Sequence, residues 1–251
     1  MLLNISNVNF PSLVLPVIVS LLISYLLGSV NFAIIFTKLF IKDDIRNHGS
    51  GNAGMTNVLR IVGSLPAILT FVFDFLKSVI SVLVSTWIVS FFCQDPEVVR
   101  FISYLSGFVC IIGHLFPVFF GFRGGKGIVT AAGMICVTDW RVFIAILAVF
   151  GIVFLMKRII SLASISCAVA FPVLTFIFKY LIDGLGGKIP TANALLLTSV
   201  ALVAGIVVII KHGENIKRLL NGTEKPIQPK KTLNNFRHLP QDNVYFVECS
   251  P

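Results

Sequence analysis

Long apolar runs dominate this 251-residue chain, and they limit what it can fold into. Hydrophobic residues make up 56% of the sequence and charged residues only 12%, about half the charged share of a soluble domain. A helix needs roughly 20 apolar residues to cross a bilayer. We therefore predict an all-α integral membrane protein, a seven-helix transmembrane bundle with candidate spans at 13–36, 61–92, 101–120, 127–138, 142–156, 159–179 and 192–210.

The fourth candidate, 127–138, is short for a span. Its residues rise only about 18 Å, against a hydrocarbon core of about 30 Å. It either crosses the bilayer or enters part-way and turns back with the fifth segment. The number of full crossings is odd in both cases, so we expect the two termini on opposite sides.

Lysine and arginine set the expected orientation. Most of the 20 such residues fall in segments on the side of the C-terminus. Only four fall in segments on the other side: Arg100, Arg141, Lys179 and Lys188. This bias predicts the N-terminus outside and the C-terminus in the cytoplasm. The net charge of +9 then reflects topology and attraction to anionic membrane lipid, and it gives no argument for nucleic acid.

Composition divides the chain into two parts. Residues 1–222 form a single polytopic membrane domain, and residues 223–251 form a polar cytoplasmic tail. Within the domain, residues 38–46, KLFIKDDIR, mix apolar and charged side chains and predict a helix lying on the cytoplasmic face.

Three glycine-bearing polar segments face the cytoplasm in this topology: 49–60, 113–127 and 211–224. The first, GSGNAGMTNVLR, contains G-x-G-x-x-G, with Asp74 about twenty residues on. No buried strand precedes it, so a dinucleotide site is rejected. Glycine backbone, hydroxyl and amide donors and the start of a following helix suit an anion. The alternative is a turn that only caps the second span.

The second segment, GHLFPVFFGFRGGKG, ends with Lys126 among glycines at a helix start. No Ser or Thr follows Lys126, so it is not a Walker A loop. It predicts a second anion site, or else a basic anchor that only sets topology. His114 is a packing residue or a functional one.

The third segment, KHGENIKRLLNGTE, carries His212, Asn215 and Arg218 at three-residue spacing, which places them on one arc of a helix. Glu224 could fix a basic residue or polarise a hydroxyl. The alternative is a charged helix flank at the membrane surface. Inside the second span, Asp74 and Lys77 predict a structural ion pair near the first segment.

Together the three segments resemble the signature motifs of the acyl-phosphate-dependent glycerol-3-phosphate acyltransferases (PlsY-type). Their order and spacing agree over about residues 13–224, although Ala53 and Arg123 depart from the usual pattern. The resemblance implies a multi-pass enzyme of the bacterial inner (cytoplasmic) membrane. It implies acyl transfer from acyl phosphate to the sn-1 hydroxyl of glycerol 3-phosphate, giving 1-acylglycerol 3-phosphate and phosphate.

We expect the following roles, with no cofactor and no metal. Ser50, His212 and Asn215 are the catalytic candidates. The acyl-phosphate site is expected to use Gly51, Asn52, Gly54, Thr56 and Asn57, with the backbone from Gly51 to Gly54 cradling the phosphate. The glycerol-3-phosphate site is expected to use Arg60, Lys126 and Arg218, and the supporting residues are His114, Gly124, Gly125, Gly127 and Glu224. The general base stays open between His212 and a phosphate oxygen of the substrate.

A membrane transporter of phosphate or organic anions is the main alternative. Transport predicts polar groups near the midplane and an inverted repeat. The sequence instead gathers its polar groups at one interface and shows no repeat.

Overall fold

The computed structural model describes residues 10–224 and residue 226, and they form a helical bundle. Six of its helical segments are long and apolar enough to cross a membrane: Ser12–Ile41, Ser64–Phe92, Pro96–Phe120, Trp140–Lys157, Ile160–Gly184 and Thr191–Lys211. The predicted fourth span is helix α6, Ile128–Thr138, which is apolar but shorter. Residues 1–9, 225 and 227–251, which include most of the predicted tail, lie outside the described residues.

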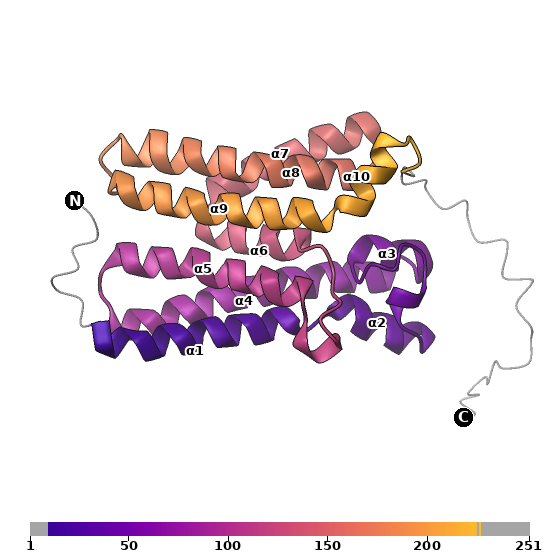
Figure 1. The fold of residues 1–251 in the computed structure, drawn as a ribbon, viewed down its shortest axis with the longest axis horizontal. Coiled ribbons are helices and arrows are strands. Elements are labelled where there is room, and N and C mark those ends of the chain that lie inside the picture. The colour runs from indigo at the N-terminus through magenta and orange to yellow at the C-terminus, as the bar shows by residue number, and fades with distance from the viewer. Residues whose placement is uncertain (1–9, 225, 227–251) are drawn as a thin grey trace, which may run out of the picture.

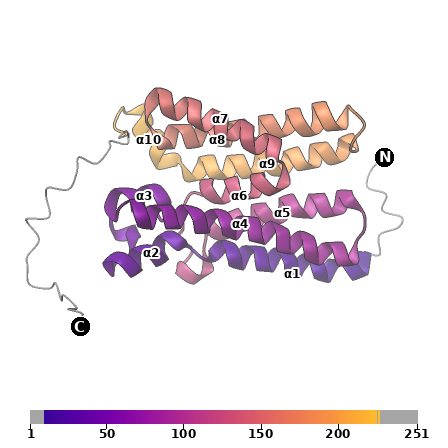
Figure 2. The same ribbon diagram turned by 180° about the vertical axis from the view of Figure 1, so that it is seen from behind.

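The helices form two packed groups (Figures 1 and 2). In one, α1 (Phe10–Ser29) packs against α4 (Ser64–Phe92) and α5 (Pro96–Leu115). In the other, α8 (Ile160–Thr175) packs against α7 (Trp140–Lys157) and α9 (Thr191–Lys211). Helix α6 packs against α4, α5 and α7, and it therefore joins the two groups.

The predicted first span, 13–36, lies within the candidate span Ser12–Ile41, but this segment is not one continuous helix, because the chain breaks between α1 and α2 (Phe32–Ile41). Asn31 caps α2 by accepting a hydrogen bond from the Ile34 N–H at 3.1 Å, and its Nδ2 lies 3.3 Å from the Ala53 carbonyl. The break therefore ties α2 to the first glycine-rich segment. A similar break at Gly63, where φ is 126°, separates α3 (Met55–Ile61) from α4.

The predicted surface helix at 38–46 is also wrong. Its first residues complete α2, which ends at Ile41, and Lys42 follows in a left-handed conformation. A 3₁₀ turn, η2 (Ile45–Asn47), comes next and is capped by Asp44, whose carboxylate accepts from the Arg46 N–H.

The third span begins earlier than predicted, at Pro96 instead of 101, and ends as predicted at Phe120. Within it, the α-helix α5 ends at Leu115. Asp95 caps this helix and Pro96 occupies its first turn, which is the preferred use of both residues. The helix stops before Pro117, and a short 3₁₀ turn, η3 (Val118–Phe120), follows. After α8 the chain continues as a π-helical segment, η4 (Phe176–Gly184), before α9.

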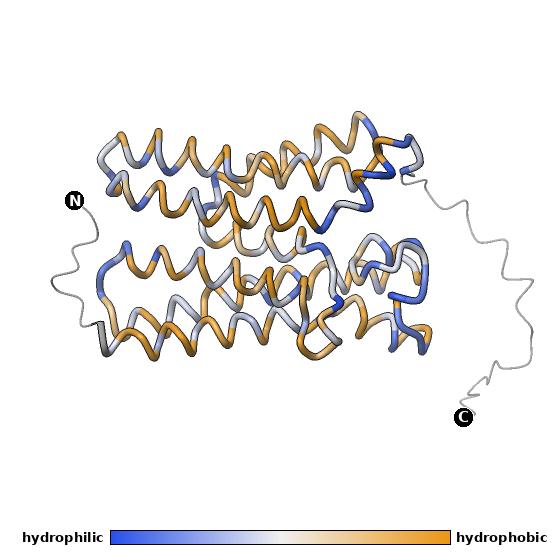
Figure 3. The backbone as a smooth tube through the Cα atoms, viewed as in Figure 1, coloured by the Kyte–Doolittle hydropathy of each residue, from blue (hydrophilic) through white to orange (hydrophobic). Residues whose placement is uncertain are grey.

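Polar residues gather at the two ends of the long axis, and Figure 3 shows blue segments at the end where α2, α3 and α10 (Gly213–Leu220) lie. The connections α2–α4 and α5–α6 and the segment after α9 all lie at this end (Figures 1 and 3). The three glycine-bearing segments therefore lie at one end of the bundle, as the sequence predicts.

Candidate active site

The first glycine-rich loop, between η2 and α3, is shaped around the side chain of Asn57. The Asn57 Nδ2 lies 2.9 Å from the His48 carbonyl, 3.1 Å from that of Asn52 and 3.3 Å from that of Ile45. Its Oδ1 accepts the Ser50 N–H at 3.1 Å. The buried side-chain amide of Asn57 is fully engaged in hydrogen bonds with loop backbone. We therefore assign Asn57 a positioning role in place of contact with phosphate.

The glycines of this loop serve its shape more than a ligand. Gly49 and Gly51 adopt φ of 58° and 69°, a region that favours glycine. The Gly51 N–H donates to the His48 carbonyl and the Gly54 N–H to the Asn52 carbonyl, each at 3.0 Å. The N–H groups of these two glycines are thus engaged by loop carbonyls, and the predicted phosphate cradle from Gly51 to Gly54 stays a prediction. The start of α3 remains as a source of backbone donors.

The second loop folds back tightly on the end of α5. The Gly124 and Gly125 N–H groups donate to the carbonyls of Leu115 and His114, at 3.3 Å and 3.1 Å. A Cβ on Gly125 would clash with the His114 ring and would lie 2.6 Å from the Ala53 carbonyl. Both glycines are needed for close backbone approach, and this packing brings the second loop against the first.

A buried polar cluster lies beneath both loops. The Lys77 Nζ donates to the Val30 carbonyl at 2.6 Å, at the break between α1 and α2, and lies 3.0 Å from the His114 Nδ1. It also pairs with Asp74 at 2.7 Å, so the predicted ion pair is confirmed. Lys77 thus connects three segments of the chain, and His114 lies within this cluster and also lines the pocket described below.

The third segment is organised by Glu224. Its carboxylate accepts from the Asn215 Nδ2 at 2.8 Å, the Arg218 Nε at 2.5 Å and the Ser161 hydroxyl at 2.7 Å. Lys126, from the second loop, donates to the Asn215 Oδ1. Glu224 therefore holds a basic residue, Arg218, which is one of its two expected roles, and the polarising of a hydroxyl stays a prediction. The second and third segments meet directly through Lys126 and Asn215.

Burial changes the protonation of two groups here. Desolvation, followed by the nearby Arg218 charge, lowers the pKa of Lys126 to about 8. Desolvation also lowers the pKa of His212 to about 4. The His212 Nδ1 lies 2.8 Å from the Val208 carbonyl, which can only accept, so Nδ1 carries the proton. The ring is therefore neutral at pH 7, with an unprotonated Nε2.

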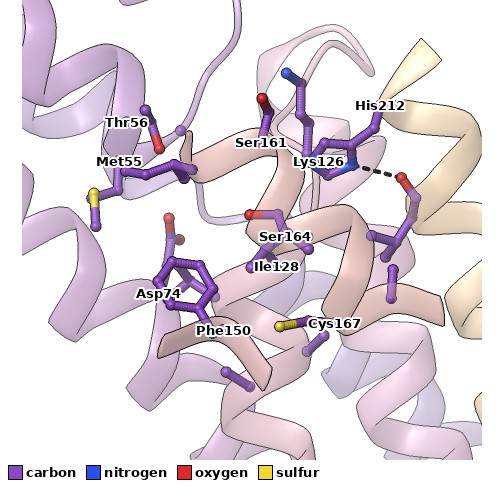
Figure 4. A pocket seen from close by; sticks show the side chains of 18 of the residues that line it. Met55, Thr56, Asp74, Lys126, Ile128, Phe150, Ser161, Ser164, Cys167 and His212 are labelled. Atoms are coloured by element: carbon purple, nitrogen blue, oxygen red, sulfur yellow. Dashed lines mark hydrogen bonds between the residues drawn. The ribbon is translucent and has the colours of Figure 1, made fainter. Parts of the chain in front are cut away.

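All three segments line one pocket of about 410 Å³ between the two helix groups (Figure 4). Figure 4 shows Thr56, Lys126 and His212 around its polar part, and Phe150 and Cys167 deeper in. The deeper part is apolar and is lined by α6, α7 and α8, through residues that include Ile128, Ile135, Phe143, Ile146, Phe150, Ala168 and Phe171. The pocket can therefore hold an anionic group at its mouth and a hydrocarbon chain inside.

The pocket brings together nearly all of the predicted site residues: Ser50, Asn52, Gly54, Thr56, Asn57, Arg60, His114, Lys126, Gly127, His212, Asn215, Arg218 and Glu224. Gly51, Gly124 and Gly125 do not line it. Sequence reasoning missed Ser161 and Ser164 of α8. Their three-residue spacing in an apolar helix, which puts both hydroxyls on one face, was the available signal.

Comparison with known proteins agrees with this site. The sequence profile of a family described as glycerol-3-phosphate acyltransferase matches residues 18–222. A glycerol-3-phosphate acyltransferase of Salinibacter ruber is 40% identical, over 83% of this chain and 91% of the relative. One from Aquifex aeolicus is 39% identical, over 80% of this chain and 94% of the relative.

Two crystal structures are similar in fold and sequence. They are the glycerol 3-phosphate form and the lysophosphatidic acid form of PlsY, an integral membrane glycerol 3-phosphate acyltransferase. Their TM-scores are 0.71 and 0.68, each at 35% identity. The matches cover 84% of this chain and 96% and 95% of the PlsY chains. Given the pocket, the profile match and these relatives, the chain belongs to the integral membrane glycerol-3-phosphate acyltransferase family.

Proposed function

We propose that this chain transfers an acyl group from acyl phosphate to the sn-1 hydroxyl of glycerol 3-phosphate. The products are 1-acylglycerol 3-phosphate and inorganic phosphate. The observation that carries the proposal is the single pocket that joins a cationic mouth to an apolar interior. Both substrates are anions, and the donor also has a hydrocarbon tail, so the two halves of the pocket match the two halves of the donor.

We assign the phosphate of glycerol 3-phosphate to the cations at the mouth, Lys126, Arg60 and Arg218. Each lines the pocket, and Glu224 orients Arg218. Charge-assisted hydrogen bonds from such groups are the stronger kind. The donor phosphate is assigned to Ser50, Asn52, Thr56 and the N-terminal N–H groups of α3, where a helix start favours an anion.

In the reaction, the sn-1 oxygen attacks the acyl carbonyl carbon, and the bond from that carbon to the phosphate oxygen breaks. Phosphate leaves with the bonding electron pair. Pre-oriented donors stabilise the charge that develops on the carbonyl oxygen and on the departing phosphate. Asn215, held between Lys126 and Glu224, is assigned to orient the attacking hydroxyl.

The pKa of His212 bears on the choice of base. A group whose pKa is about 4 is a weak proton acceptor at neutral pH. We therefore assign the proton to a phosphate oxygen of a substrate. His212 instead accepts a hydrogen bond from the hydroxyl at its unprotonated Nε2.

We also propose the finer topology and location. The chain would make seven passes, with α6 as a short one, and it would have its N-terminus outside and its active site at the cytoplasmic face of a bacterial inner membrane. The lysine and arginine bias supports this orientation. The cations that line the pocket and α10 lie at the same end of the bundle.

A donor comparison tests the activity. Purified protein in detergent micelles receives glycerol 3-phosphate with acyl phosphate, acyl-CoA or acyl carrier protein carrying the same chain, and 1-acylglycerol 3-phosphate and phosphate are measured. We expect product only with acyl phosphate. Turnover with acyl-CoA alone would refute the donor assignment. If no donor gives product and the protein in sealed vesicles takes up phosphate, the transporter alternative would be favoured instead.

A further inference from the structure

A second hollow lies apart from the pocket, between α2, η2 and the loop after Pro117. It has a volume of about 500 Å³ and is lined by Lys38, Asp44, Arg46, Asn47, Phe119, Phe120, Gly121 and Arg123. None of these residues lines the active-site pocket. The second signature segment therefore presents its two cations to different places, Lys126 to the pocket and Arg123 to this recess.

The recess carries surplus positive charge. Arg46 and Asp44 neutralise each other through contacts at 3.0 Å and 2.8 Å, which hold the pKa of Asp44 below its usual value. Arg46 also donates to the carbonyls of Phe120 and Arg123, at 2.7 Å and 3.1 Å. Lys38 and Arg123 are exposed, and their side chains have no hydrogen-bond partner among the described residues. Two cations are thus left to attract an anion.

Exposed apolar residues include Phe119, which lines the recess, and direct chain neighbours of other lining residues. Phe119 and Phe122 are 58% and 56% exposed, and Leu39 and Phe40 of α2 are 69% and 46% exposed. Phe122 is held at a φ of 59°, which a bulky residue rarely adopts, with its N–H donating to the Pro117 carbonyl at 2.9 Å. Exposed aromatic and aliphatic side chains beside cations, at the end of apolar helices, are typical of a membrane interface.

We propose that this recess binds the phosphate group of an anionic phospholipid. Arg123 supplies a planar fork suited to phosphate, and Lys38 supplies a point charge. The lipid glycerol and acyl chains lie against Phe119, Phe122 and the exposed face of α2. Inorganic phosphate shares the chemistry of the head group, but these exposed apolar residues favour the lipid.

Native mass spectrometry of detergent-purified protein tests the site. The wild type, Lys38→Ala/Arg123→Ala and the control Lys157→Ala/Arg158→Ala are titrated with phosphatidylglycerol and with phosphatidylcholine. The control removes two exposed cations at the end of α7, on the opposite side of the bundle from α2 in Figures 1 and 2. We expect the wild type to prefer phosphatidylglycerol. The recess variant should weaken that binding roughly tenfold and the control by less than about twofold.

Three results would overturn the proposal. The first is unchanged binding in the recess variant, and the second is an equal loss in both variants, which would indicate diffuse attraction. The third is full displacement of phosphatidylglycerol by excess inorganic phosphate, which would assign the recess to a soluble anion. Melting temperatures in detergent confirm that each variant is folded, and Lys38→Gln/Arg123→Gln replaces the alanine variant if that one unfolds.

Discussion

Two charged clusters, near opposite ends of the bundle, differ in how their charges are balanced. Away from the pocket, Asp139 and Asp183 bind Arg141 at 2.7 Å and 2.6 Å, and Lys179 binds Asp139 at 2.8 Å. These two acids and two bases pair directly with one another, and the exposed Lys188, 3.9 Å from Asp183, is a third base at the edge of the cluster. At the pocket, Arg60, Lys126 and Arg218 line the site beside the carboxylate of Glu224.

The difference separates structural charge from functional charge. Where every carboxylate is paired directly with a base, as in the first cluster, the charges of a partly buried site mainly fix packing. A site with more cations than acids lowers the free energy of a bound anion. The following predictions test whether the charges of the first cluster serve stability and those at the pocket serve activity.

The largest effect is expected for Lys126→Ala. The ammonium is partly buried beside Asn215, and its loss would remove the proposed charge-assisted contact to the substrate phosphate. We expect kcat/KM for glycerol 3-phosphate to fall roughly 10²–10³-fold, measured by phosphate release. Arg123→Ala removes the other cation of the same segment and should change kcat/KM less than about threefold. Equal losses in the two variants would contradict the separation of pocket and recess.

Next comes Lys77→Met, which leaves Asp74 buried without its partner. Removing one member of a buried pair costs about 3–5 kcal/mol, so the melting temperature should fall. Because Lys77 also holds the Val30 carbonyl and His114, kcat should fall roughly tenfold in the protein that stays folded. Lys77→Met/Asp74→Asn should recover most of the melting temperature but not kcat.

The matched variant in the other cluster is Asp183→Asn. It breaks the pair with Arg141 and should lower the melting temperature without changing kcat or KM. A loss of activity per folded molecule would show that this cluster is not purely structural.

His212→Gln should lower kcat roughly tenfold, because one neutral hydrogen bond to the attacking hydroxyl is lost. A loss above about 10⁴-fold would instead indicate that His212 is the base. Because the pKa of His212 is lowered to about 4, we expect this ring to give no inflection of the kcat profile near pH 6.5.

The sequence predicted the membrane class, the segments and their convergence, because apolar length and charge bias act locally. It did not predict the break at Val30 and Asn31, where hydropathy continues unchanged. That break depends on Lys77 and on the Ala53 carbonyl, which are distant in sequence. Asp95, Pro96 and Pro117 indicate where helix α5 begins and ends, at Pro96 and Leu115. The prediction relied on apolar runs alone and therefore missed these helix boundaries.

For the site residues, too, the sequence predicted some features and could not predict others. Residue type and spacing identified His212, Asn215 and Arg218 as one face. They could not reveal that Asn57 is occupied by loop backbone, or that Ser161 reaches Glu224 from α8. Both facts depend on contacts between segments.

The most direct test of the surplus charge at the pocket is the pH dependence of kcat/KM for glycerol 3-phosphate. This ratio reports the ionisation of the free enzyme. Because the pKa of Lys126 is lowered to about 8, its charged form is present below that pH and is lost as pH rises through it. We expect kcat/KM to fall about fourfold between pH 7 and 8.5 in the wild type, and to stay constant in Lys126→Arg, whose guanidinium remains charged. A flat wild-type profile, or the same fall in Lys126→Arg, would contradict the assignment of the substrate phosphate to Lys126.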